Sequence, residues 1–190
     1  LPCIDKIAWI DLDAFVLKPL YDFWSQPVAA CGITARTDSV LYLNTVGLPG
    51  NTSWHDSYGY SFNAGVLLLS LETLRQSKFE ATIVQHWAVT LGFNDQVVLN
   101  MACNGTQGVL NETMNMLMVA NFAKARKPNK NWVTHLYYPP PEEWVIAHFV
   151  SSRKPWTTNA LKTLPHFIRV WDKHKLALAD ALTQSYIPQE

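Results

Sequence analysis

No charge of either sign predominates in this sequence, which contains 15 Lys plus Arg and 15 Asp plus Glu. Nucleic-acid-binding proteins usually carry an excess of basic residues, so that class is disfavoured. No apolar run reaches the roughly 18 residues that a membrane-spanning helix needs, and no secretory signal peptide is visible. Because the chain begins at Leu1 and not at a methionine, we expect a fragment whose start lies upstream.

Cysteine is scarce as well. The three cysteines, Cys3, Cys31 and Cys103, form no CxxC pair and no zinc-site spacing. Free cysteines are among the most buried residue types, so we expect buried free thiols.

Apolar residues are plentiful, in contrast to charged ones. Hydrophobic residues make up 48% of the 190-residue chain and charged residues 16%, a balance that favours a packed core over disorder. The length suits one domain spanning residues 1–190. Eight Trp, seven Tyr and eight Phe can bury a large area or line a cleft that stacks rings.

Strand-like and helix-like segments alternate along the chain. Lys6–Ile10 and Phe62–Leu69 are continuous apolar runs, which are typical of strands buried on both faces of a parallel sheet. Val28–Ile33 and Val145–Phe149 resemble them. Ser70 directly follows the run Phe62–Leu69 and is suited to cap a helix there. This alternation predicts an α/β fold with a mixed, mainly parallel sheet flanked by helices.

Two carboxylates follow the first strand-like run. Ligands of open α/β sheets bind at the carboxyl ends of the strands, and Asp11 and Asp13 lie at such an end. Carboxylate oxygens are suited to hold Mg²⁺ or Mn²⁺. The alternative is a solvated turn, because Asp-x-Asp alone is a common pattern.

A histidine lies at the end of the last strand-like run, and a lysine follows it. His148 offers an imidazole ligand, and Lys154 offers a point charge that can reach a phosphate. With the two aspartates they describe a site for a metal and a diphosphate. A lone histidine is otherwise most often an ordinary core or surface residue.

Polar residues also mark the central run and the helix after it. Asn63 can hydrogen-bond sugar hydroxyls, and Gly65 allows the backbone to approach a ligand closely. Asp95 and Gln96 open a predicted helix, where an aspartate most often acts as a cap.

Together these segments resemble glycosyltransferase family 8. Four segments occur in the family's order: Ile10–Asp13, Phe62–Gly65, Asp95–Asn100 and His148–Trp156. The resemblance covers positions 10 to 156 and implies the GT-A fold, here incomplete at its N-terminus because the family's first strands lie upstream of this chain. It also implies a UDP-sugar donor, Mn²⁺ with Mg²⁺ as the alternative, and retention of configuration at the anomeric carbon.

The resemblance further assigns roles to individual residues. Asp11, Asp13 and His148 match the metal ligands, and Lys154 matches the diphosphate contact. The donor-sugar contacts are matched by Asn63, Ala64 and Gly65. Asp95 matches the residue that holds the sugar hydroxyls, and Gln96 matches the side chain nearest the face of the sugar opposite the leaving group. Ser151 stands in the diphosphate loop, where the family usually has Gly.

Retention leaves two routes open. The amide of Gln96 is a poor nucleophile, which favours attack from the front face, whereas Asp95 could serve a double displacement.

Among other enzyme classes, a haloacid-dehalogenase phosphatase needs Thr or Val where this chain has Phe15. A translesion polymerase needs a basic chain and a second acidic segment. A glycogenin-like self-glucosylating protein and an inactive binding module stay as alternatives.

Two further features bear on the acceptor and on the compartment. We expect the acceptor, a carbohydrate, glycan or protein, to be chosen by the aromatic loop 34–60 and the proline-rich stretch Pro139–Pro141. Sequons at Asn51, Asn104 and Asn111 favour a Golgi or secretory lumen and a glycoprotein, with a cytoplasmic enzyme as the alternative.

Overall fold

The computed structural model describes residues 3–38, 61–90, 94–118, 140–150, 154, 156, 171–173, 175–177 and 179–180. The chain folds into two compact units. The first unit comprises Leu1–Met116 and Pro128–His148, and the second comprises Leu117–Lys127 and Phe149–Glu190. A single domain over 1–190 therefore stays a prediction.

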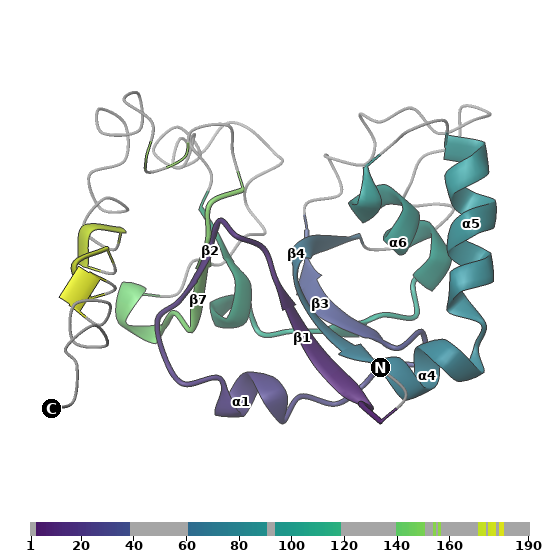
Figure 1. The fold of residues 1–190 in the computed structure, drawn as a ribbon, viewed down its shortest axis with the longest axis horizontal. Helices are drawn as coiled ribbons and strands as arrows, with labels where there is room; N and C mark the ends of the chain where they lie inside the picture. Colours follow the sequence, from purple (N-terminus) through teal and green to yellow (C-terminus); the bar gives the residue numbers. More distant parts are fainter. Residues whose placement is uncertain are drawn as a thin grey trace, which may run out of the picture. The chain divides into compact units, whose positions relative to one another are not determined.

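A four-stranded sheet of order β1-β4-β3-β5 forms the centre of the first unit (Figure 1). Its strands are β1 (Lys6–Ile10), β3 (Ile33–Thr37), β4 (Phe62–Ser70) and β5 (Gly108–Val109). β4 lies between β1 and β3 and is antiparallel to both, whereas β3 and β5 are parallel. The sheet is therefore mixed as expected, but among the described strand pairs the antiparallel ones predominate.

A second, smaller sheet has the order β2-β7-β6. It contains β2 (Ala14–Val16), β6 (Met116–Leu117) and β7 (Ile146–His148). β2 and β7 are antiparallel, with Ala14 opposite His148. The chain passes from the first sheet to the second between β1 and β2, and Asp11 and Asp13 lie in that passage.

Helices lie beside β3 and β4 in Figure 1, and they pack on β4 and on the edge strand β1. These are α4 (Leu71–Gln76), α5 (Phe79–Thr90) and α6 (Asp95–Cys103). The short helices are α1 (Tyr21–Trp24), η1 (Glu112–Asn115) and η2 (Pro141–Glu143). No helix among the described residues is long and apolar enough to cross a membrane.

The caps of α4 and α6 test two sequence expectations. Ser70 caps α4 as predicted, because its hydroxyl oxygen accepts from the Thr73 N–H at 3.2 Å. The expected cap at Asp95 is wrong by one residue. Asn94 is the N-cap of α6 and accepts from the Val97 N–H at 3.2 Å, so Asp95 is the first residue of the helix itself.

β4 is apolar throughout most of its length because both of its faces are buried. Val66 and Leu68 pack into one core cluster, and Leu67 packs into another. Successive side chains of a strand point to opposite faces, so an uninterrupted apolar run can supply two cores at once. Burying each of these side chains stabilises the fold by roughly 1.5–3 kcal/mol relative to leaving it exposed.

The cysteines differ from the expectation of free thiols. Cys31 and Cys103 form a disulfide with a Cα–Cα distance of 5.2 Å, and Cys3 is a free, exposed thiol. The bond joins the residues before β3 to the last residue of α6. Its partners are 72 positions apart, a separation that carries no recognisable pattern in the sequence.

Other expectations differ or fall outside the described residues. β3 begins at Ile33, the residue at which the predicted strand Val28–Ile33 ends, because Gly32 turns the chain with a φ of 82°. Positions 39–60, Pro139 and Ser151 are not described.

Candidate metal and donor-sugar site

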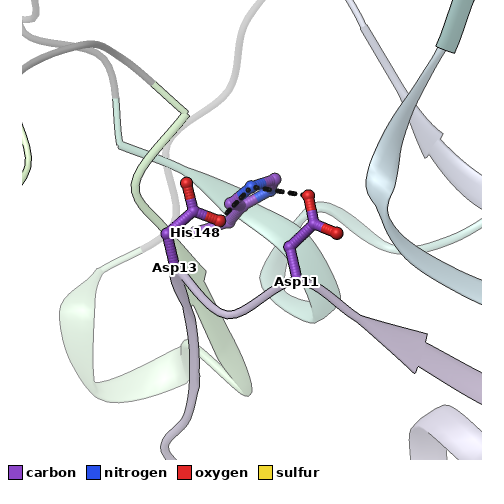
Figure 2. A group of neighbouring side chains, drawn as sticks. All are labelled: Asp11, Asp13 and His148. Carbon is purple, nitrogen blue, oxygen red and sulfur yellow. Dashed lines mark ion pairs between the residues drawn. The ribbon is translucent and has the colours of Figure 1, made fainter. Parts of the chain in front are cut away.

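Three side chains that can each give one ligand atom to a metal, here called the three donors, converge where the chain passes between the two sheets (Figure 2). Asp11 follows β1, Asp13 precedes β2, and His148 is the last residue of β7. His148 Nε2 lies 3.2 Å from Asp13 Oδ1 and 3.9 Å from Asp11 Oδ2. One ligand atom from each residue lies within 4.8 Å of the other two.

The backbone and one tryptophan fix the position of Asp11. Its N–H donates to the Gly65 carbonyl at 2.8 Å, and its own carbonyl accepts from the Ala14 N–H at 2.9 Å. Trp9 Nε1 donates to Asp11 Oδ1 at 3.0 Å. Trp9 is missing from the sequence-based site, although it lies in β1 two positions before Asp11, where the period of a strand brings the two side chains to one side.

Gly65 makes room for the histidine. A Cβ atom added at this position would lie 1.9 Å from His148 Cε1 and 2.6 Å from its Nε2. The sequence predicted that Gly65 lets the backbone approach a ligand, and the group that approaches it in the structure is the imidazole. Any larger residue there would displace the ring.

Buried amides lie behind the three donors. His148 Nδ1 is 3.1 Å from Asn115 Oδ1, and Asn115 Nδ2 donates to Asn63 Oδ1 at 3.0 Å. Asn115 is completely buried, and Asn63 and His148 are 7% and 3% exposed. Sequence reasoning missed Asn115, because it lies in a short 3₁₀ helix with no motif around it.

The same contacts continue to the start of α6. Gln96 Oε1 accepts from the Ala64 N–H at 3.1 Å and from Asn63 Nδ2 at 3.3 Å. Gln96 Nε2 donates to Asp38 Oδ2 at 3.0 Å. Hydrogen bonds therefore connect four of the sequence-predicted residues, namely Asn63, Ala64, Gly65 and Gln96. Asp38, which was not predicted, is bonded to the same group through Gln96.

The remaining predicted residues are placed separately. Asp95 is exposed, and its Oδ1 accepts from the Gln96 N–H at 2.9 Å. Lys154 belongs to the second unit, where its amino group donates to the Phe149 carbonyl. Its role at a diphosphate stays a prediction.

The chemistry of the three donors suits a divalent cation. Two carboxylates and an imidazole nitrogen are ligands that Mn²⁺ accepts. Exposure rises from the His148 side chain at 4% through Asp13 at 20% to Asp11 at 42%. A cation held there would be shielded from solvent on the side of His148 and open to solvent on the side of Asp11.

A model of glycosyl transferase family 8 matches residues 1–160. The chain belongs to glycosyltransferase family 8. It is 30% identical over 113 residues to the glycosyltransferase GlyD of Streptococcus pneumoniae serotype 4 (strain ATCC BAA-334 / TIGR4), and the match covers 54% of this chain and 13% of GlyD.

Solved structures agree on the fold of this family 8 chain. The galactosyltransferase LgtC, in complex with donor and acceptor sugar analogs, superposes with a TM-score of 0.56 at 24% identity over 83% of this chain and 56% of LgtC. The apo form of GlyE from Streptococcus pneumoniae TIGR4 gives a TM-score of 0.57 at 20% identity over 82% of this chain and 36% of GlyE. The predicted GT-A fold is confirmed. The chain spans less than two thirds of each of these three relatives.

Proposed function

We propose that this protein is a retaining glycosyltransferase that moves a hexosyl group from a UDP-sugar to an acceptor hydroxyl and depends on Mn²⁺, with Mg²⁺ as the alternative ion. One observation carries the proposal. In a member of glycosyltransferase family 8, Asp11, Asp13 and His148 converge beside a buried amide network that reaches Asn63 and Gln96.

The three donors would hold the cation, with Asp13 and His148 on its buried side. Bound Mn²⁺ would supply positive charge to the diphosphate, which gains negative charge as the glycosidic bond breaks. Lys154 is expected to add a second positive charge to the same leaving group. Asn63, Ala64 and Gly65 are expected to contact the donor sugar, with the exposed carboxylate of Asp95 orienting its hydroxyls.

The hydrogen bonds of Gln96 bear on how configuration is retained. An amide oxygen has two lone pairs, and Gln96 Oε1 already accepts from Asn63 and from the Ala64 N–H. Attack on an anomeric carbon requires a free lone pair. This favours front-face attack, or a double displacement through Asp95, over direct attack by Gln96.

The disulfide supports a secretory or Golgi lumen, because structural disulfides persist in oxidising compartments. Asn104 and Asn111, the two described sequon asparagines, are both exposed. We expect protein isolated from its own cell to lose mass when N-glycans are removed enzymatically. Replacing Asn104 and Asn111 with Gln should remove the loss attributable to those sites, and an unchanged mass of the parent protein would favour the cytoplasmic alternative.

The activity is tested by incubating the protein, at the full length its cell makes, with a panel of UDP-hexoses. Mass spectrometry would follow transfer or hydrolysis with Mn²⁺ and with EDTA. We expect turnover of one donor that requires Mn²⁺ and that falls at least 1000-fold, roughly 4 kcal/mol of transition-state stabilisation, in Asp11→Asn plus Asp13→Asn. Metal-independent turnover, or turnover unchanged in the double variant, would refute the proposal.

A further inference from the structure

The amides behind His148 form an ordered chain that starts at the backbone of β4. The Gly65 N–H donates to Asn63 Oδ1 at 3.0 Å. A backbone N–H can only donate, so this contact identifies the oxygen of the Asn63 amide. The Ala64 N–H identifies the oxygen of Gln96 in the same way. Asn63 Nδ2 then faces Gln96 Oε1 as a donor facing an acceptor, and the two assignments agree.

The orientation of Asn63 determines that of Asn115. Asn63 presents its oxygen to Asn115 at 3.0 Å, so the Asn115 group in that contact must be the NH₂. The other end of the same amide, Oδ1, therefore faces His148 Nδ1 at 3.1 Å. The backbone of Asn115 is held in turn, because its carbonyl accepts from Arg36 Nη1 at 2.7 Å.

An oxygen facing Nδ1 has a direct consequence for the histidine. Asn115 Oδ1 can only accept, so Nδ1 must carry the proton of the neutral ring. Nε2 then bears the lone pair, and it is Nε2 that faces Asp13 at 3.2 Å and Asp11 at 3.9 Å. With the opposite tautomer, Nε2–H would donate to Asp13 Oδ1 and block the place where a cation would lie. The buried Nδ1 lone pair would then face the Asn115 oxygen at 3.1 Å, where two acceptors repel each other.

We infer that Asn115 is a positioning residue that sets the tautomer of His148 and so prepares Nε2 to bind a divalent cation. The inference rests on the metal site of the proposed function. It adds that the site is prepared before any cation binds, by a chain of hydrogen bonds anchored on the backbone N–H groups of Ala64 and Gly65. Groups behind a metal ligand that fix its ring in this way commonly contribute about 10–100-fold to metal affinity.

The tautomer is measured directly by two-dimensional ¹H–¹⁵N NMR of the histidine rings in the metal-free protein, at a pH high enough for the rings to be neutral. A His148→Gln spectrum assigns the signals of His148. We expect a protonated Nδ1 and an unprotonated Nε2. A ring protonated mainly on Nε2 would overturn the inference, and this measurement needs no variant of Asn115.

A second measurement is the Mn²⁺ affinity of Asn115→Ala, determined by calorimetry. We expect the affinity to fall about 10–100-fold while the folded structure is retained, and the His148 signals to shift toward the Nε2-protonated form. Asn100→Ala is the matched control. Asn100 is also a buried amide (3% exposed), but its side chain bonds the backbone of Phe62 and Gln96. Folded Asn115→Ala with the affinity and tautomer of the parent would refute the inference.

The two measurements also separate this inference from the proposed function. If the parent protein binds no Mn²⁺ but its His148 is protonated on Nδ1, the amide chain is correct and the proposed metal function fails. If Mn²⁺ binds tightly and His148 is protonated on Nε2 in the metal-free protein, the proposed function survives and the role assigned to Asn115 fails.

Discussion

The two halves of β4 serve different purposes. From Val66 to Ser70 the strand pairs with β1 in regular register, and its side chains at 66, 67 and 68 fill both core clusters. From Phe62 to Gly65 the backbone N–H groups at 62, 64 and 65 donate to side-chain oxygens, namely those of Asn100, Gln96 and Asn63.

This difference shows how one strand can combine stability with a functional site. The apolar half holds the strand in place, and the other half uses the strand's rigidity to orient polar groups. Buried amides are costly unless they are hydrogen-bonded, and a backbone that is already fixed meets that need without further loss of entropy. Changes in the two halves should therefore have separable effects on stability and on metal binding.

The largest effect on stability is expected in the apolar half. Leu68 is completely buried, and Leu68→Ala should lower the free energy of unfolding by about 2–5 kcal/mol because it leaves a cavity. Chemical denaturation measures this. Mn²⁺ affinity of the folded protein should stay within about twofold of the parent. Leu176→Ala, at a side chain that is 65% exposed, is the control and should change stability by less than about 0.5 kcal/mol. A loss of metal affinity equal to that of the site variants would contradict the separation.

The disulfide is expected to contribute next. Replacing Cys31 and Cys103 together with Ser should cost about 2–4 kcal/mol, because the bond closes a long loop and restricts the unfolded chain. Denaturation curves with and without reductant measure this. Reductant should destabilise the parent and Cys3→Ser but leave the double variant unchanged. Equal sensitivity of all three proteins to reductant would show that the bond does not stabilise the fold.

In the half of β4 from Phe62 to Gly65, Gly65→Ala should mainly weaken the metal site. The new Cβ would overlap the imidazole of His148, so the ring must move away from Asp11 and Asp13. We expect Mn²⁺ affinity measured by calorimetry to fall about 10–100-fold, or roughly 1.4–2.7 kcal/mol. An affinity equal to that of the parent would mean that the histidine does not need this position.

The smallest effect is expected at Trp9. Trp9→Phe keeps an aromatic ring but removes the N–H that donates to Asp11 Oδ1. Because the contact is exposed, we expect only about a 2–5-fold loss of Mn²⁺ affinity, near 1 kcal/mol or less. Trp24→Phe is the control, since Trp24 is exposed to a similar degree and its ring contacts Lys6. Equal effects of the two substitutions would remove any role for the Trp9 N–H.

The sequence predicted those parts of the site that follow strand ends. Asp11 and His148 stand at the ends of two apolar runs, which indicated a site at strand ends. That β1 and β7 belong to two different sheets, with the site between them, could not be predicted from the runs. Asn115 could not, because its partners Asn63 and His148 lie 52 and 33 positions away and no local pattern marks it.

The fold was predictable to a similar extent. The apolar run of β4 identified the central strand, but a run buried on both faces does not reveal whether its neighbours are parallel or antiparallel. The pairing of Cys31 with Cys103 depends on β3 and α6 packing together, which only the tertiary structure determines. The loop expected to begin at position 34 was placed too early, because residues up to Thr37 belong to β3, and positions 39–60 are not described. Pro140 and Pro141 lead into η2, and the acceptor role of both stretches stays a prediction.

The central claim is that Asp11, Asp13 and His148 hold a divalent cation. Calorimetric titration of Mn²⁺ into the parent protein and into Asp11→Asn plus Asp13→Asn tests it most directly. We expect one saturable site in the parent and none in the double variant, since the amides retain the shape of the side chains but lose both charges. Absence of binding to the parent, or equal binding to both proteins, would contradict the claim.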